Sequence, residues 1–335
     1  MTAFRGMKSS QPAPLLNSVV GRLPVEPLCW NMLSKKVLQF ILLTFLISWS
    51  VALAAYLLRI AYGSILFLVI VAVCYMPAPA YATLILQKLV YRGTLTAYGF
   101  TLKNLSWRWL LITTVGFVWF IVLGTFVVIG ILGNIFGVAL IGRVDFSEAA
   151  LLQQVTIFTR GAFGNLPQHV PIPPVAIFLL SLVQGVIAGF TISLPFTLGE
   201  ELGWRGLLLR ETQGWGFLRS NLFVGVVWGL WHAPIIAQGH NYPGHPVAGI
   251  FMMTLFTTTL SFPMAYCRFK SRSILGPSAL HGTLNAIGPL TAFFVVGANP
   301  LFGFVAGIAG IAVILLLTAG ICFFDKKFIR DYQIL

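Results

Sequence analysis

Two acidic residues stand side by side in a chain that has only eight of them in 335 residues. They are Glu200 and Glu201, in the segment Gly199-Glu200-Glu201-Leu202-Gly203-Trp204-Arg205, directly after the apolar run 175–198. On a helix, Glu201 and Arg205 share a face, whereas Glu200 is turned about 100° away. The arginine can then hold one carboxylate while the other is free to accept a proton. An interfacial salt bridge beside a solvated acid is an equally good interpretation of this segment alone.

Two histidines lie in later apolar runs. His232 follows Trp228 by four positions and precedes Pro234. Proline interrupts helical hydrogen bonding, which is tolerated within a membrane where the backbone lines a cavity. His281 and Asn285 are also four positions apart and would point the same way. Each pair alone is more often a hydrogen-bonded contact between helices, but together with the glutamates they offer a carboxylate, two imidazoles and an amide, a combination that packing alone would rarely require.

The same residues could hold a metal ion. Glu200, His232 and His281 would supply one carboxylate and two imidazoles, a ligand set used in catalytic zinc sites. The chain has no HExxH sequence, the helical zinc-binding motif of metalloproteases. We therefore favour a mechanism that requires no cofactor, with zinc as the alternative.

The composition around these residues indicates a membrane protein. Hydrophobic residues make up 58% of the chain and charged residues 9%, whereas a soluble domain has about 25% charged residues. About 20 apolar residues suffice for a helix to span a bilayer. The fold class expected is therefore an all-α membrane protein, a bundle of about eight transmembrane helices. The apolar runs that predict them are 37–58, 64–87, 109–133, 175–198, 220–238, 247–267, 274–296 and 302–324.

The basic residues predict how this bundle is oriented, since cytosolic loops are enriched in Lys and Arg. With the N-terminus in the cytosol, 18 of the 21 Lys and Arg residues fall in cytosolic segments, and only Arg59, Arg143 and Arg160 do not. Both termini are then cytosolic, and the formal net charge of +13 requires no nucleic acid. The expected division is a flexible cytosolic segment 1–36, a polytopic membrane domain 37–324 with its catalytic core at about 175–290, and a cytosolic tail 325–335.

In its three polar segments the sequence resembles the CPBP family of CAAX-processing and bacteriocin-processing intramembrane proteases, also called the Abi family. The resemblance rests on Glu200-Glu201-x-x-x-Arg205, Trp228-x-x-x-His232 and His281-x-x-x-Asn285. They follow the order and spacing of the family's E-E-x-x-x-R, F-x-x-x-H and H-x-x-x-N motifs. Trp228 stands where the family usually has Phe and keeps an aromatic side chain there. The eight-span layout is also similar to the family's fold.

This resemblance implies an endopeptidase that hydrolyses a peptide bond near the membrane face, as eukaryotic relatives do when they remove the last three residues of prenylated proteins. The family is often labelled metalloprotease. In its mechanism the first glutamate and the histidine of the second motif would activate a water. The histidine and asparagine of the third motif would stabilise the oxyanion, and the second glutamate and the arginine would orient the first glutamate. The catalytic residues implied are Glu200, Glu201, Arg205, His232, His281 and Asn285.

The partners expected are the lipid bilayer and a peptide or protein substrate, lipidated or not. The expected location is the plasma membrane, because nothing in the sequence indicates an organelle. A proton- or solute-translocating transporter is an alternative, since carboxylates and histidines within a membrane also serve proton relays. It would show flux in liposomes without peptide cleavage. A non-catalytic membrane scaffold or immunity factor would keep the same residues without turnover.

Overall fold

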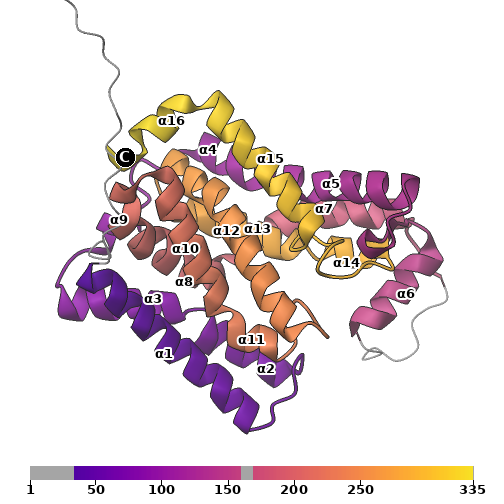
Figure 1. The fold of residues 1–335 in the computed structure, drawn as a ribbon, viewed down its shortest axis with the longest axis horizontal. Helices are drawn as coiled ribbons and strands as arrows, with labels where there is room; N and C mark the ends of the chain where they lie inside the picture. The colour runs from indigo at the N-terminus through magenta and orange to yellow at the C-terminus, as the bar shows by residue number, and fades with distance from the viewer. Residues whose placement is uncertain (1–33, 160–168, 335) are drawn as a thin grey trace, which may run out of the picture. The chain divides into compact units, whose positions relative to one another are not determined.

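The computed structural model describes residues 34–159 and 169–334, and the fold over these residues is mostly helical, as predicted (Figure 1). Most of the expected segment 1–36 lies outside the described residues. The elements, with η for short π and 3₁₀ helices, are α1 Lys35–Leu57, α2 Ile65–Ile70, η2 Val71–Tyr75, α3 Ala78–Leu84, η3 Ile85–Val90, η4 Leu95–Tyr98, α4 Trp107–Leu111, η5 Ile112–Gly116, α5 Phe117–Ile129, η6 Gly130–Ile135, η7 Ala139–Ile141, β1 Arg143–Val144, α6 Glu148–Thr159, α7 Pro174–Phe190, α8 Leu194–Glu201, η8 Leu202–Leu208, α9 Leu209–Thr212, η9 Gln213–Trp215, α10 Phe217–Trp231, α11 Ala233–Ala237, α12 Pro246–Ser271, α13 Leu275–Ile287, α14 Leu290–Phe294, β2 Val295–Val296, α15 Ile308–Phe324, α16 Lys326–Asp331 and η10 Tyr332–Ile334.

Four of these helical stretches are long and apolar enough to cross a membrane: α1, Ile65–Val90, Trp107–Ile135 and α12. Two bent pairs raise the number to as many as six. In the first, α7 meets Leu194–Trp215 at 59°, and in the second, α15 meets Lys326–Ile334 at 86°. The described part of the chain therefore has four to six candidate spans, which makes it a multi-pass integral membrane protein. Two of the eight predicted runs contain shorter helices, because α10 has 15 residues and α13 has 13.

Large apolar side chains on the long helices face outward. Ile65 is 82% exposed, Phe251 is 73% exposed and Leu46 is 66% exposed. In water this surface would be costly, whereas hydrocarbon chains cover it without penalty. The backbone groups of these helices are satisfied internally, as a bilayer requires. The outward faces thus fit lipid contact.

The apolar run 175–198 is not one straight helix. α7 ends at Phe190, and α8 begins at Leu194 in a new direction. Pro195 occupies the first turn of α8, where its missing N–H removes no helical hydrogen bond. Glu200 and Glu201 therefore lie on a second helical segment rather than at the end of a straight span. The run ahead of the glutamates does not by itself fix their depth in the membrane.

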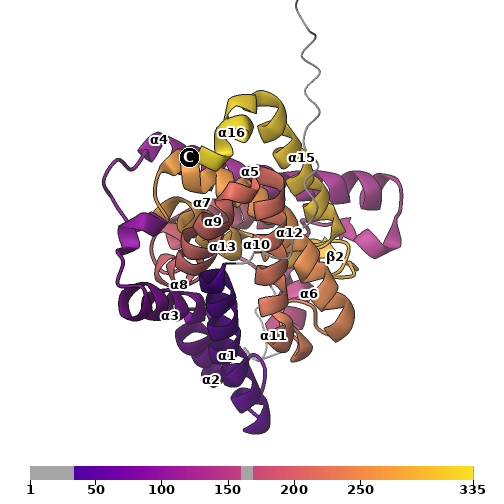
Figure 2. The same ribbon diagram turned by 60° about the vertical axis from the view of Figure 1, so that its left-hand side comes forward.

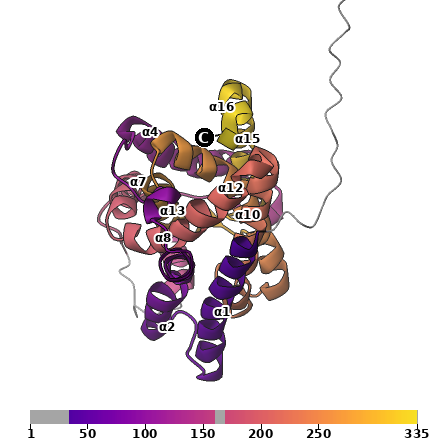
Figure 3. The same ribbon diagram turned by 90° about the vertical axis from the view of Figure 1, so that its left-hand side faces the viewer.

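The helices that carry the polar motifs pack together in the described bundle. α10 runs along α12, and α13 packs against both α7 and α8 (Figure 1). The turned views in Figure 2 and Figure 3 keep α10 beside α12 and α8 near α13. β1 and β2 pair antiparallel, with Arg143 opposite Val296, and tie the segment after η7 to the end of α14. Residues 142–174, between the predicted runs 109–133 and 175–198, thus contain β1 and α6, and residues 160–168 lie outside the described ranges.

Two glycines allow α7 to approach α13 closely. A Cβ built on Gly189 would lie 2.6 Å from the backbone nitrogen of Thr283, and one on Gly185 would lie 2.3 Å from Cγ1 of Ile287. Both distances are shorter than real Cβ contacts, so any larger residue must push the two helices apart. The position of α13, and with it His281, depends on these glycines.

Substitution of Gly189 by alanine is expected to lower the thermal unfolding temperature of the purified protein. Overpacking of this kind costs about 1–3 kcal/mol, because the obstructing atoms belong to the backbone of α13. Gly116→Ala is the matched control, since nothing lies within 4 Å of a Cβ at that helical position. Equal unfolding temperatures for the two variants would contradict the close packing of α7 on α13.

Candidate functional site

Three charged side chains are buried where α8 continues into η8. Glu200, Glu201 and Arg205 are 2%, 0% and 1% exposed. The expected pair between Glu201 and Arg205 is formed, because Nη1 of Arg205 donates to both carboxylate oxygens at 3.1 Å. Nη2 of Arg205 donates to the hydroxyl of Ser261 on α12, also at 3.1 Å. Buried charges are stable only when paired in this way, so the arginine is fixed between η8 and α12.

Glu201 also joins α8 to α13. Its Oε1 lies 2.9 Å from Nδ1 of His281. The geometry fits Nδ1–H donation to the carboxylate, which leaves Nε2 of the buried His281 ring for another partner. A carboxylate placed behind an imidazole fixes its tautomer and stabilises its protonated form. The arginine, the glutamate and the histidine therefore form one connected network.

Glu200 makes a different contact. Nε1 of Trp228 on α10 donates to its Oε2 at 3.2 Å. The Arg205 guanidinium lies over the same indole ring, 4.2 Å from the centroid, and the ring centroids of Trp228 and His281 are 5.3 Å apart. Within the described part of the chain, Trp228 is the only residue that donates a hydrogen bond to the Glu200 carboxylate. The other carboxylate oxygen of Glu200, Oε1, is thus available to accept a hydrogen bond from a water or a substrate.

His232 stands at the break between α10 and α11. Its Nδ1 lies 2.9 Å from the Trp228 carbonyl oxygen. A carbonyl only accepts, so Nδ1 carries the hydrogen and the neutral ring presents the Nε2 lone pair. Pro234 interrupts the helix here, and the Trp231 carbonyl is satisfied by side chains, the Tyr75 hydroxyl and the Trp49 indole. The ring centroids of His232 and Trp228 are 6.0 Å apart, so Trp228 has both histidines beside it.

Asn285 is not part of this network. It lies on α13 one turn after His281, but its side chain is exposed. The Asn285 side chain forms no hydrogen bond with any residue in the described ranges. The structure therefore brings together Glu200, Glu201, Arg205, His232 and His281 around Trp228, and leaves Asn285 beside them.

Two contributors were not predicted from the sequence. Trp228 was expected only as an aromatic wall, yet it donates to Glu200 and lies under Arg205. Ser261 had no expected role and accepts from Arg205. The sequence offered only a weak indication of the role of Trp228. The N–H of a buried tryptophan usually has a hydrogen-bond partner, but the sequence does not identify that partner.

The donor set does not fit a metal site in the arrangement described. No group of three or more His, Cys, Asp or Glu side chains in residues 34–159 and 169–334 is placed to hold a metal ion. Glu200, His232 and His281 are the candidate ligands, but they surround the Trp228 ring rather than a common point.

Comparison with known proteins gives one family match. Residues 172–287 match the family described as Type II CAAX prenyl endopeptidase Rce1-like. The matched region begins just before α7, ends with α13 and contains all six residues predicted for the site. No curated protein matches the chain.

Proposed function

We propose that this chain, whose residues 172–287 belong to the Rce1-like type II CAAX prenyl endopeptidase family, is an intramembrane endopeptidase. The members of this family are peptidases. The observation that carries the proposal is the arrangement in which the Glu200 carboxylate, with a single hydrogen bond from Trp228, and the rings of His232 and His281 all lie beside the Trp228 ring. A carboxylate and imidazoles placed in this way suit activation of water and stabilisation of an oxyanion.

In the proposed mechanism, Glu200 is the general base, and His232 helps to position the water through its Nε2 lone pair. A proton passes from the water to Glu200 as the oxygen bonds to the scissile carbonyl carbon. The carbonyl oxygen becomes an oxyanion that accepts from His281 Nε2–H when that ring is protonated, and from the Asn285 amide. Collapse of the intermediate breaks the C–N bond, and the leaving amine takes the proton from Glu200.

Glu201 and Arg205 act as positioning residues. The hydrogen bonds of Glu201 go to His281 and Arg205 rather than to Glu200, which supports a role in orienting and charging the His281 ring. Arg205 balances the second glutamate and contacts Trp228, the donor to Glu200. Electrostatic stabilisation of this kind is strong where water is excluded.

The proposed setting is a bundle of eight spans with both termini in the cytosol, in the plasma membrane. The substrate would be a peptide or protein segment near the cytosolic face, with or without a prenyl group. The charge asymmetry of the loops supports this orientation. The favoured mechanism uses no metal, because Glu200 supplies the base and His281 and Asn285 supply the donors to the oxyanion.

The proposal can be tested by sequencing peptide termini in membranes that contain either the wild-type chain or Glu200→Ala. New C-termini are expected only with the wild-type protein. A purified wild-type chain should also cleave a reporter peptide that contains one such site. Identical sets of termini in the two membranes, together with wild-type cleavage by purified Glu200→Ala, would remove the proteolytic assignment.

Trp228→Phe is expected to lower the rate of peptide cleavage by about 10- to 100-fold without abolishing it. The variant loses the N–H donor to Glu200, and hydrogen bonds to charged groups contribute about 1.5–3 kcal/mol. It keeps an aromatic ring next to Arg205 and the histidines, so the protein should still fold. Trp215→Phe is the control, because Trp215 contacts Phe223 and not the site. Equal rates for the two variants would show that the indole N–H has no role.

A further inference from the structure

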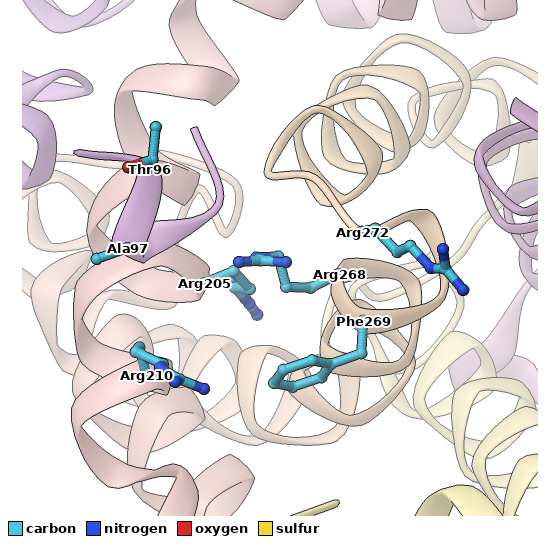
Figure 4. A pocket seen from close by; sticks show the side chains of 7 residues that line it. All are labelled: Thr96, Ala97, Arg205, Arg210, Arg268, Phe269 and Arg272. Atoms are coloured by element: carbon cyan, nitrogen blue, oxygen red, sulfur yellow. The ribbon is translucent and has the colours of Figure 1, made fainter. Parts of the chain in front are cut away.

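A second polar feature lies beside the catalytic cluster. A cavity of about 490 Å³ is lined by four arginines, Arg205, Arg210, Arg268 and Arg272, together with Phe269 and part of η4 (Figure 4). In Figure 4 the first two arginines come from the η8–α9 segment and Arg268 from the facing end of α12. Glu200, His232 and His281 do not line this cavity. We propose that it binds the phosphate group of an acidic membrane phospholipid.

The positive charge of the cavity is largely uncompensated. Among the described residues, a carboxylate partner is present only for Arg205, which pairs with Glu201. Arg210 donates to the neutral Gln213 side chain at 2.7 Å, and neither Arg268 nor Arg272 forms an ion pair with a described residue. Like charges on Arg210 and Arg268 act on each other. Three net positive charges thus face one space, which favours a bound anion.

Glu211, the acidic residue next to Arg210 on α9, already has other partners. Glu211 follows Arg210 directly, but its Oε1 pairs with Lys36 Nζ at 3.0 Å and accepts from Tyr98. It is therefore not turned to the arginines. The anion must come from outside the described residues.

Arg268 has an unmet hydrogen-bonding requirement. Its Nε is buried and has no partner among the described residues. The Arg268 side chain lines the cavity, and the hydrogen bonds that its Nε lacks leave the guanidinium poorly compensated where it stands. A phosphate oxygen in the cavity could accept charge-assisted hydrogen bonds from the guanidinium, which arginine forms well with phosphate.

The backbone of the loop before α4 leaves room for this arginine. Gly99 has φ +78°, and a Cβ there would lie 1.9 Å from Nη2 of Arg268. The Gly99 carbonyl accepts from the backbone N–H of Ile274 at 2.9 Å, so the loop is tied to the connection between α12 and α13. Only glycine fits at this position, both for its backbone conformation and for the space that Arg268 occupies.

The position of the cavity identifies the source of the phosphate. Its walls come from three segments that the charge distribution places in the cytosol: the loop before α4, the η8–α9 segment and the end of α12. Basic pockets between membrane helices on the cytosolic side bind lipid headgroups, and that leaflet holds the acidic lipids. Phe269 adds an apolar wall. A lipid phosphodiester and a peptide carboxylate each carry one negative charge, so the membrane-side position of the cavity and its apolar wall are what favour the lipid.

The inference concerns binding and does not depend on peptidase activity. The experiment uses the full chain purified in a neutral detergent, with phosphatidylglycerol as the probe and native mass spectrometry as the readout. Arg210→Gln is expected to weaken retention of the lipid about fivefold, and Arg210→Gln/Arg268→Gln about 25-fold. The single variant affects an exposed side chain, so it keeps the test informative if the double variant does not fold. The control is Arg92→Gln/Arg108→Gln, which removes two exposed arginines from a segment that is also expected in the cytosol. This variant should retain phosphatidylglycerol as the wild type does.

Two further arms separate the possible sources of the anion. Inorganic phosphate at millimolar concentration should bind more weakly than phosphatidylglycerol, and phosphatidylcholine, whose phosphate is balanced by its own choline cation, should depend less on the arginines than phosphatidylglycerol does. Wild-type lipid retention by Arg210→Gln and by the double variant would overturn the proposal. Preference for inorganic phosphate would overturn its lipid source. Arginine-dependent binding of a peptide with a free C-terminal carboxylate, without lipid binding, would reassign the cavity to the peptide.

Discussion

Replacing Glu200 by glutamine is expected to reduce peptide cleavage by about 10²–10⁴-fold, the contribution of a general base. Glutamine has the same shape and still offers an oxygen to the Trp228 N–H, which contacts Oε2 of the glutamate. It cannot take a proton from water. The loss should therefore appear in kcat for a reporter peptide, while the thermal unfolding temperature stays within a few degrees of the wild type.

Glu148→Gln is the matched control for this change. Glu148 begins α6, far along the chain from the cluster, and bonds to the backbone N–H of Val170. The same carboxylate-to-amide exchange there should leave cleavage unchanged. If Glu200→Gln and Glu148→Gln cleaved the reporter at similar rates, another residue would have to be the base.

Glu201→Gln is expected to cause the second large effect, on stability and activity together. Removal of this charge leaves Arg205 buried without its carboxylate and the His281 ring without its anionic partner. Breaking a buried ion pair from one side costs about 3–5 kcal/mol. We expect a lower unfolding temperature and cleavage near background, because the His281 imidazolium is no longer stabilised at the oxyanion.

A double variant separates the two effects of this change. In Glu201→Gln/Arg205→Gln both charges are absent, so the unfolding temperature should recover toward the wild type and exceed that of either single variant. Cleavage should remain at background, because His281 still lacks its carboxylate. Recovery of cleavage in the double variant, or an undiminished unfolding temperature in Glu201→Gln, would contradict the network described for Glu201.

The spacing of residues in the sequence predicted contacts within one helix. The pair of Glu201 and Arg205 was expected from their separation of four, and it is formed. The same reasoning placed Asn285 on the face of His281, yet Asn285 is exposed and His281 turns to Glu201. A helix face spans a wide angle, so two residues on one face need not meet the same neighbours.

Residue spacing within one helix could not predict contacts between different helices. Trp228 reaches Glu200 across 28 residues, and Glu201 reaches His281 across 80. Both contacts depend on how α8, α10 and α13 pack, which in turn depends on close approaches such as that at Gly189. The bend after Phe190 likewise separated the glutamates from the straight span expected before them.

The amino-acid sequence by itself determined the multi-pass membrane character, the helical class and the family of the segment 172–287, because length, composition and local motifs are properties of the chain alone. Only the tertiary structure decided which carboxylate faces which partner and that four arginines share one cavity. The physical reason is that hydrogen bonds and charge interactions act over a few ångströms between side chains. Helix packing, rather than position in the sequence, sets those distances.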